Sequence, residues 1–111
     1  MNLSDDYMVI SGLEKKNNSL DVIKNCSAIT SLEINQLTLK EDWTLLSGLK
    51  QLNSLTVKDS YVDFKKFYTT ICSLPKLEKL TYNHYCFFNK NKSDRLPTNL
   101  KLPSLKKFKI E

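Results

Sequence analysis

The stretch "LNSLTVKDSYV", residues 52–62, carries apolar residues at Leu52, Leu55 and Val57 and then runs through polar and small residues to Val62. Apolar positions three and then two residues apart fit neither a helix face, which repeats every 3.6 residues, nor a plain alternating strand. A short strand that turns its two central apolar side chains to one face explains this order. The stretch therefore predicts a half-buried strand between two turns.

Copies of this pattern recur along the chain at nearly even intervals. Two further copies are nearly complete, "ITSLEINQLTL" at 29–39 and "LEKLTYNHYCF" at 77–87, and partial copies stand at 8–13 and 105–110. The register predicts that Tyr82, Tyr85 and Phe87 are core residues, and the partial copy at 8–13 places Leu13 in the same register. The central apolar residues recur at steps of roughly 23 to 28 residues, a spacing typical of structural repeats, and they are Met8, Leu32, Leu55, Leu80 and Phe108.

The pattern L-x-x-L-x-L-x-x-(N/C/S)-x-L at a period of 20–29 residues resembles the leucine-rich repeat family. The turn position that is asparagine in the family is Leu37, Ser60 and Tyr85 here, which indicates irregular coils without a continuous asparagine ladder. The resemblance implies an α/β fold, a leucine-rich-repeat solenoid in the form of a short horseshoe arc. About five parallel strands would lie on the concave side, with helical or irregular returns on the convex side.

The segments between the strands are predicted to return mainly as helices. Residues 17–29 and 40–52 carry apolar residues at helical spacing, the first with Asn17 or Asn18 as a possible cap and the second with acidic residues near its start. The strongest helix pattern begins at Asp63 and ends at Pro75, with its apolar face formed by Phe64, Phe67, Ile71 and Leu74.

Two parts of the chain depart from this helical pattern. Residues 88–103 contain two prolines and little periodicity, so they are predicted to form a loop. Trp43 is expected to lie in the core, packed between neighbouring units.

The length, composition and N-terminal sequence predict one intracellular domain. A chain of 111 residues with 41% apolar and 26% charged residues is expected to form a single domain over 1–111. We expect it to be part of a longer repeat protein, because the chain stops on the strand residues 108–111 with no return segment and one end of the core would be bare. The N-terminus lacks the basic start and apolar run of a signal peptide, so we expect a cytoplasmic or nuclear protein with no membrane attachment. The cysteines, Cys26, Cys72 and Cys86, form no C-x-x-C pair and are expected to be reduced and largely buried.

Catalysis is not expected. His84 is the only histidine, and no phosphate loop, metalloprotease motif or nucleophile elbow occurs. The sequence therefore predicts a protein that is not an enzyme and has no cofactor and no metal.

The charge is unevenly distributed along the chain. Residues 1–63 hold six Lys and nine acidic residues, a net of −3, whereas residues 64–111 hold eleven Lys or Arg and three acidic residues, a net of +8. A basic half is a candidate surface for an acidic partner.

The predicted function is that of a protein–protein interaction module that presents a concave parallel-sheet surface. The partner would be another protein, with an acidic surface as one option, and a bare solenoid end offers a route to self-association. The predicted binding residues are the outward strand positions Glu33, Asn35, Thr56, Lys58, Lys79, Thr81, Asn83, Lys107 and Lys109.

Two alternatives remain open. The first is a nucleic-acid-associated protein that binds through residues 64–111, with His84 and Phe88 at the sheet edge stacking on bases beside Lys90, Lys92 and Arg95. The second, by resemblance only, is the substrate-recognition part of a ubiquitin-ligase receptor.

Overall fold

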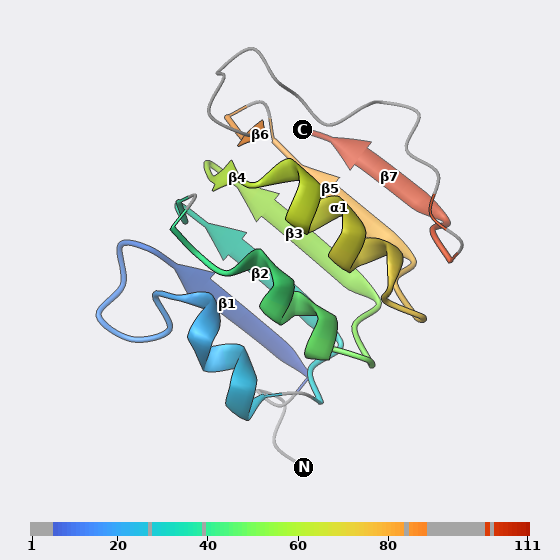
Figure 1. The fold of residues 1–111 in the computed structure, drawn as a ribbon, viewed down its shortest axis with the longest axis horizontal. Coiled ribbons are helices and arrows are strands. Elements are labelled where there is room, and N and C mark those ends of the chain that lie inside the picture. The colour runs from blue at the N-terminus through green and yellow to red at the C-terminus, as the bar shows by residue number, and fades with distance from the viewer. Residues whose placement is uncertain (1–5, 27, 39, 84, 89–101, 103) are drawn as a thin grey trace.

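The computed structural model describes residues 6–26, 28–38, 40–83, 85–88, 102 and 104–111. Five parallel strands form one sheet in the order β1-β2-β3-β5-β7 (Figure 1). Their bounds are β1 Tyr7–Ser11, β2 Ser31–Asn35, β3 Ser54–Lys58, β5 Lys79–Tyr82 and β7 Lys107–Ile110. Neighbouring strands in this order pair in parallel, so the fold belongs to the α/β class with a parallel sheet.

The sheet buries one face because apolar residues alternate with polar ones along each strand. The central apolar residues of the repeat stand in one register row across the sheet, Met8, Leu32, Leu55, Leu80 and Phe108. Leu32, Leu55 and Leu80 are buried in the core, and Met8 and Phe108 pack against it at the two edges of the sheet. The spacing of the repeat thus predicts both the strands and their register.

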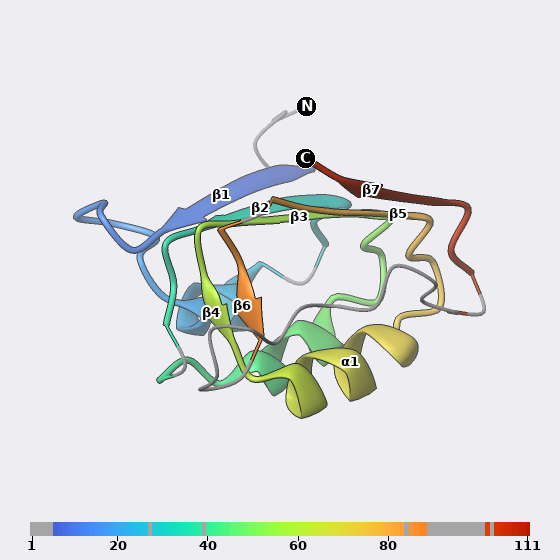
Figure 2. The same cartoon turned by 90° about the horizontal axis from the view of Figure 1, so that it is seen from above.

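Three helical segments return the chain along the buried face, which Figure 2 shows from the side. Two are short 3₁₀ helices, η2 Leu20–Asn25 and η3 Trp43–Gly48, and the third is an α-helix, α1 Phe64–Cys72. Their buried residues, including Trp43 and Phe67, join the sheet's apolar residues in one core, and these two rings meet edge to face with centroids 6.0 Å apart. Trp43 is therefore a core residue, as predicted.

Side-chain caps fix where these helices begin. Asp63 accepts the N–H of Lys66 at the start of α1, as predicted, and Asp42 accepts that of Thr44 at the start of η3. The start of η2 differs from the prediction, because its N-cap is Ser19 rather than Asn17 or Asn18.

A carboxylate from the next unit supports this cap. Glu41 Oε1 accepts the hydroxyl of Ser19 at 2.9 Å and the N–H of Leu20 at 2.8 Å. Glu41 thus links two successive units, here meaning a strand and the chain up to the next strand.

The units are also joined by a repeated backbone contact before each strand. The carbonyl of the preceding residue accepts two consecutive N–H groups from the next unit, at distances of 2.8 to 3.1 Å. The four acceptors and their donors are Asp6 with Thr30 and Ser31, Thr30 with Asn53 and Ser54, Asn53 with Glu78 and Lys79, and Glu78 with Lys106 and Lys107. Each of these units therefore depends on its neighbour to complete its hydrogen bonds.

Two buried polar groups close the turns after the strands. Ser60, which is fully buried, donates its hydroxyl to the carbonyl of Lys58 at 2.9 Å and accepts the N–H of Leu37 at 3.1 Å. The Cys86 thiol donates to the carbonyl of Val57 at 3.2 Å. Ser60 thus occupies the turn position that the repeat assigns to it.

The prediction that Tyr85 is a core residue is wrong. Tyr85 is 69% exposed and Cys86 is fully buried in its place. The reason is one additional residue after β5. Val57 pairs with Tyr82, and the same offset would pair Tyr61 with Cys86. Instead, Tyr61 of β4 (Tyr61–Val62) pairs with Phe87 of β6 (Phe87–Phe88), one position further along the chain.

Leu13, which the repeat register aligns with the buried Leu37, is instead 77% exposed. After β1 the chain folds back onto the strand's own edge, where Ser11 donates its N–H to the carbonyl of Asn17. Gly12 allows the close approach that begins this loop, since a Cβ there would lie 2.1 Å from the carbonyl oxygen of Gln36. Leu13 is thereby directed to solvent.

Candidate interaction surface

The face of the sheet opposite the helices carries none of the described helices (Figure 2). We call this surface the open face. Its side chains form three rows across the strands. They are Tyr7, Ser31, Ser54, Lys79 and Lys107; then Val9, Glu33, Thr56, Thr81 and Lys109; and then Ser11, Asn35 and Lys58. Most of these side chains are small or polar. Lysines lie at one end of the open face, and Tyr7 and Val9 lie at the other.

Eight of the nine predicted binding residues lie together on the open face. The ninth is Asn83. It stands one residue beyond β5 and is engaged with Asp59 in the adjoining turn. Its Oδ1 accepts the N–H of Asp59 at 3.0 Å, and its Nδ2 donates to Asp59 Oδ1 at 2.9 Å. Asn83 therefore holds the turn and is not a free binding group.

Lys79, Lys107 and Lys109 form a basic corner of the open face. Lys79 and Lys107 are direct register partners on adjacent strands, and all three side chains are exposed. Within the described part of the chain, no carboxylate lies within ion-pair distance of them. Like charges on neighbouring strands repel one another, so a negative group bound between them relieves this repulsion.

The middle of the open face has an acidic group that is already partnered. Glu33 on β2 accepts a hydrogen bond from Asn35 Nδ2 at 2.7 Å. Its register neighbours are Val9 and Thr56, which are uncharged. The open face thus changes from uncharged and acidic on β1 and β2 to basic on β5 and β7.

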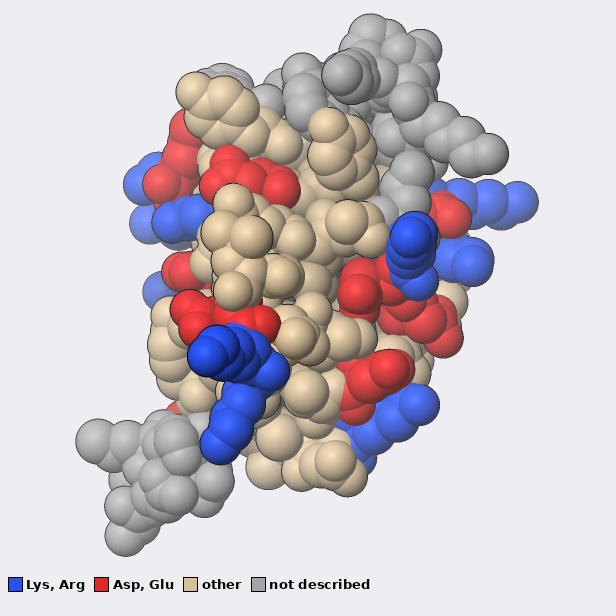
Figure 3. Space-filling model, turned by 90° about the vertical axis from the view of Figure 1, so that its left-hand side faces the viewer, with Lys and Arg blue, Asp and Glu red and all other residues tan. Residues whose placement is uncertain are grey.

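The side toward which the strands point is shown in Figure 3. Uncharged side chains form a band through its middle, and acidic and basic side chains flank the band. Gln36 and Asp59, which follow β2 and β3, adopt positive φ angles of 57° and 51°. At both turns the chain leaves the sheet after the strand ends. Aspartate is one of the residue types enriched at positive φ, so Asp59 suits this conformation, whereas the glutamine at position 36 gives no such signal.

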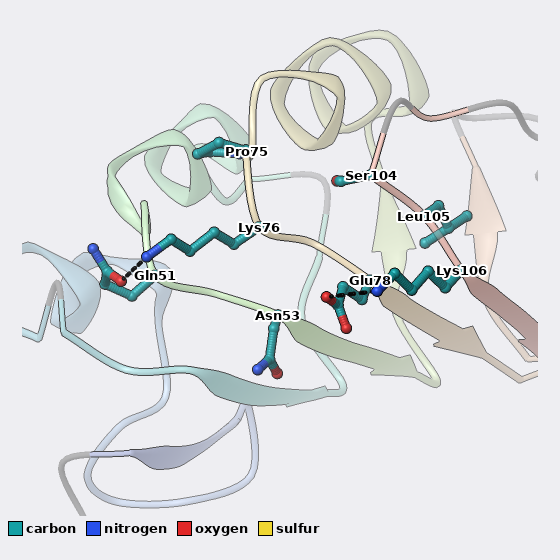
Figure 4. A pocket seen from close by; sticks show the side chains of 8 residues that line it. All are labelled: Gln51, Asn53, Pro75, Lys76, Glu78, Ser104, Leu105 and Lys106. Atoms are coloured by element: carbon teal, nitrogen blue, oxygen red, sulfur yellow. Dashed lines mark hydrogen bonds and ion pairs between the residues drawn. The ribbon is translucent and has the colours of Figure 1, made fainter.

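The opposite side, where the strands begin, has a hollow of about 410 Å³ (Figure 4). Two lysines that line the hollow each have a polar partner in its wall. Lys76 Nζ donates to Gln51 Oε1 at 2.7 Å, and Lys106 Nζ lies 3.4 Å from Glu78 Oε1. The hollow is therefore a space between successive turns in which both lysines already have a polar partner.

The cysteine thiols differ in exposure. Burial raises the pKa of the Cys86 thiol, which stays protonated and donates within the turn. Cys26 and Cys72 are half-buried free thiols. The described residues include no group of three or more His, Cys, Asp or Glu side chains that could hold a metal ion.

Other predicted groups fall outside the described residues. These are His84, Lys90, Lys92 and Arg95, and the side chain of Phe88 is likewise not described. In the part of the chain that is described, no helix has both the length and the apolar character needed to cross a membrane. No protein-family model, curated protein or solved structure matches this chain.

Proposed function

We propose that this chain is a leucine-rich-repeat solenoid that serves as a protein–protein interaction module, with no catalytic activity. Parallel strands follow one another in chain order at register steps of roughly 23 to 28 residues, which supports the repeat assignment. The repeated carbonyl contacts between units support it as well. In such a fold the strand side would be concave and the helical side convex.

The open face is the proposed binding surface. The observation that carries this proposal is the row of exposed lysines on β5 and β7, which have no anionic partner among the described residues. The flanking residues Thr56 and Thr81 are small, so a partner can approach the backbone of the sheet closely. The best-fitting partner is a protein with an acidic segment that lies across the basic corner.

The test is affinity capture from native lysate, with and without nuclease, with two matched variants. The first variant replaces Lys79, Lys107 and Lys109 by glutamate. The second variant also introduces glutamate, at three exposed lysines outside the open face, Lys40, Lys50 and Lys65, so it changes the net charge by the same amount. A protein partner whose capture persists after nuclease treatment should bind the wild type and the second variant equally. Its affinity for the first variant should be at least about tenfold lower.

Two results would contradict the proposal. Equal loss of the partner in both variants would show that net charge, and not the open face, determines binding. Capture that disappears with nuclease and falls steeply with salt would favour the nucleic-acid alternative instead.

A further inference from the structure

Strand β1 leaves part of its backbone unpaired at the outer edge of the sheet. The contacts of Ser31 with Asp6 and of Gly12 with Asn35 show that Met8 and Ile10 direct their N–H and C=O groups toward β2. Tyr7, Val9 and Ser11 therefore direct theirs outward. The loop after β1 satisfies Ser11, whose N–H donates to Asn17 and whose carbonyl accepts from Glu14. Among the described residues, nothing pairs with the outward groups of Tyr7 and Val9.

Apolar side chains surround this unpaired edge. Tyr7 is 50% exposed, Val9 36% and Leu13 77%, and all three lie on β1 or in the loop that follows it. A hollow of about 680 Å³ lies beside Val9 and Leu13. Natural sheets usually protect an edge with charges, proline or a bulge, and the segment Tyr7–Ser11 contains no charged residue and no proline.

We propose that a second copy of this chain pairs with this edge, β1 against β1 in antiparallel orientation about a two-fold axis. With Met8 facing Met8 of the second copy, Tyr7 lies opposite Val9 of the second copy, and Val9 opposite its Tyr7. These two are hydrogen-bonded pairs, so every outward N–H and C=O group of Tyr7 and Val9 gains a partner. The pairing ends at Ser11, whose groups are already used.

Side chains and charges fit this arrangement. Each Tyr7 lies across from a Val9 on the open face, and aromatic and β-branched residues form favourable cross-strand pairs. The antiparallel direction also places the exposed Asp6 of each copy near the end of the other copy's β1. The loop there carries Lys15 and Lys16 against one acid, Glu14, so its net charge is opposite to that of Asp6.

The two-fold arrangement has a consequence for the proposed function. The axis is perpendicular to the sheet, so the two sheets join into one and both open faces lie on the same side. The two basic corners then stand at opposite ends of the joined surface, on the order of 40 Å apart at about 4.8 Å per strand. Such a dimer presents two equivalent sites to a repeated or dimeric acidic partner.

The first experiment measures self-association by sedimentation velocity across micromolar concentrations. Val9→Pro removes the outward N–H without breaking the pairing with β2, since proline is tolerated where the N–H faces away from the sheet. We expect this variant to raise the dimer dissociation constant at least about tenfold, because one hydrogen bond per copy is lost. Val9→Thr, which keeps the N–H, should dimerise like the wild type, as should the variant with glutamate at Lys79, Lys107 and Lys109.

A charge exchange tests the same contact if the proline variant does not fold. Asp6→Lys should weaken the dimer, and the further changes Lys15→Glu and Lys16→Glu should restore it. Asp21→Lys, an exposed site on η2, serves as the control that leaves the dimer unchanged. A restored dimer in the triple variant is not expected from a merely structural effect at Asp6.

The register is tested with cysteine. In the proposed dimer, Met8 lies opposite Met8 of the second copy, with about 4.5 Å between their Cα atoms. Met8→Cys should therefore form a disulfide-linked dimer under oxidation, in larger amount than the native cysteines do in the wild type. A monomer at all concentrations would overturn the proposal, as would a dimer insensitive to Val9→Pro. Crosslinking only between Met8→Cys and Phe108→Cys would overturn it too, because it would indicate head-to-tail stacking of β7 on β1.

Discussion

Replacing Ser60 by alanine tests how the turns are held together. The change removes one oxygen from a fully buried site and leaves the N–H of Leu37 without its acceptor. The carbonyl of Lys58 loses the hydroxyl but keeps the N–H of Gln36 at 3.1 Å. The cost is thus that of one buried unsatisfied donor, about 2 kcal/mol in the free energy of unfolding.

Two measurements check this magnitude. In a chain of this size about 2 kcal/mol corresponds to a fall of roughly 10 °C in the melting temperature, which circular dichroism detects. The Leu37 amide should also exchange its hydrogen faster in the variant. Ser54→Ala, at a half-buried position on the open face, is the control and should change stability by less than about 0.5 kcal/mol. A Ser60→Ala variant as stable as this control, with Leu37 protected as before, would refute the reasoning.

Three further predictions concern stability. Leu55→Ala, at a fully buried position, should lower the free energy of unfolding by about 3 to 4 kcal/mol in urea denaturation, whereas Thr56→Ala on the open face should cost less than about 0.5 kcal/mol. Asp63→Ala should cost about 1 kcal/mol by removing the acceptor at the start of α1, and Asp63→Asn should retain most of it. Burial raises the pKa of the Cys86 thiol in the folded chain above its ordinary value of 9.0, so its protonated form is favoured by folding. The stability of the wild type relative to Cys86→Ala should therefore be constant below that value and decline as pH rises above it, and urea midpoints at a series of pH values would show no such decline if the thiol were exposed.

The strands were the part of the fold that the sequence predicted best. The order of apolar residues in each repeat follows directly from a strand that buries one face, so Leu32, Leu55 and Leu80 were placed correctly in core and register. The prediction of helix α1 was also correct, because Asp63 caps its start and the apolar residues that follow form its buried face.

The errors occurred where the number of residues in a turn is not fixed by any apolar pattern. One additional residue after β5 moves Cys86 into the buried position and Tyr85 into solvent. The loop after β1 displaces Leu13 in the same way. Both turns depend on backbone hydrogen bonds, which leave little trace in the side-chain sequence.

The candidate surface could be predicted only in part. Outward strand positions follow from alternation, so eight of the nine predicted binding residues lie on the open face. The engagement of Asn83 with Asp59 could not be predicted, because it depends on how two turns far apart in the chain meet. The unpaired edge at Tyr7 and Val9 was missed for the same reason, since edges are a property of the assembled sheet.

The paired contacts at the start of each strand have a mechanical consequence. Among the described residues, each strand of the five-stranded sheet pairs only with its neighbours in that sheet, so a force applied to the two ends would load one such boundary at a time. We expect the chain to extend in steps as strands peel from the edges, each releasing about 25 residues, or roughly 85 Å of contour length. A single-molecule trace with one all-or-none rupture would mean that the units give way together.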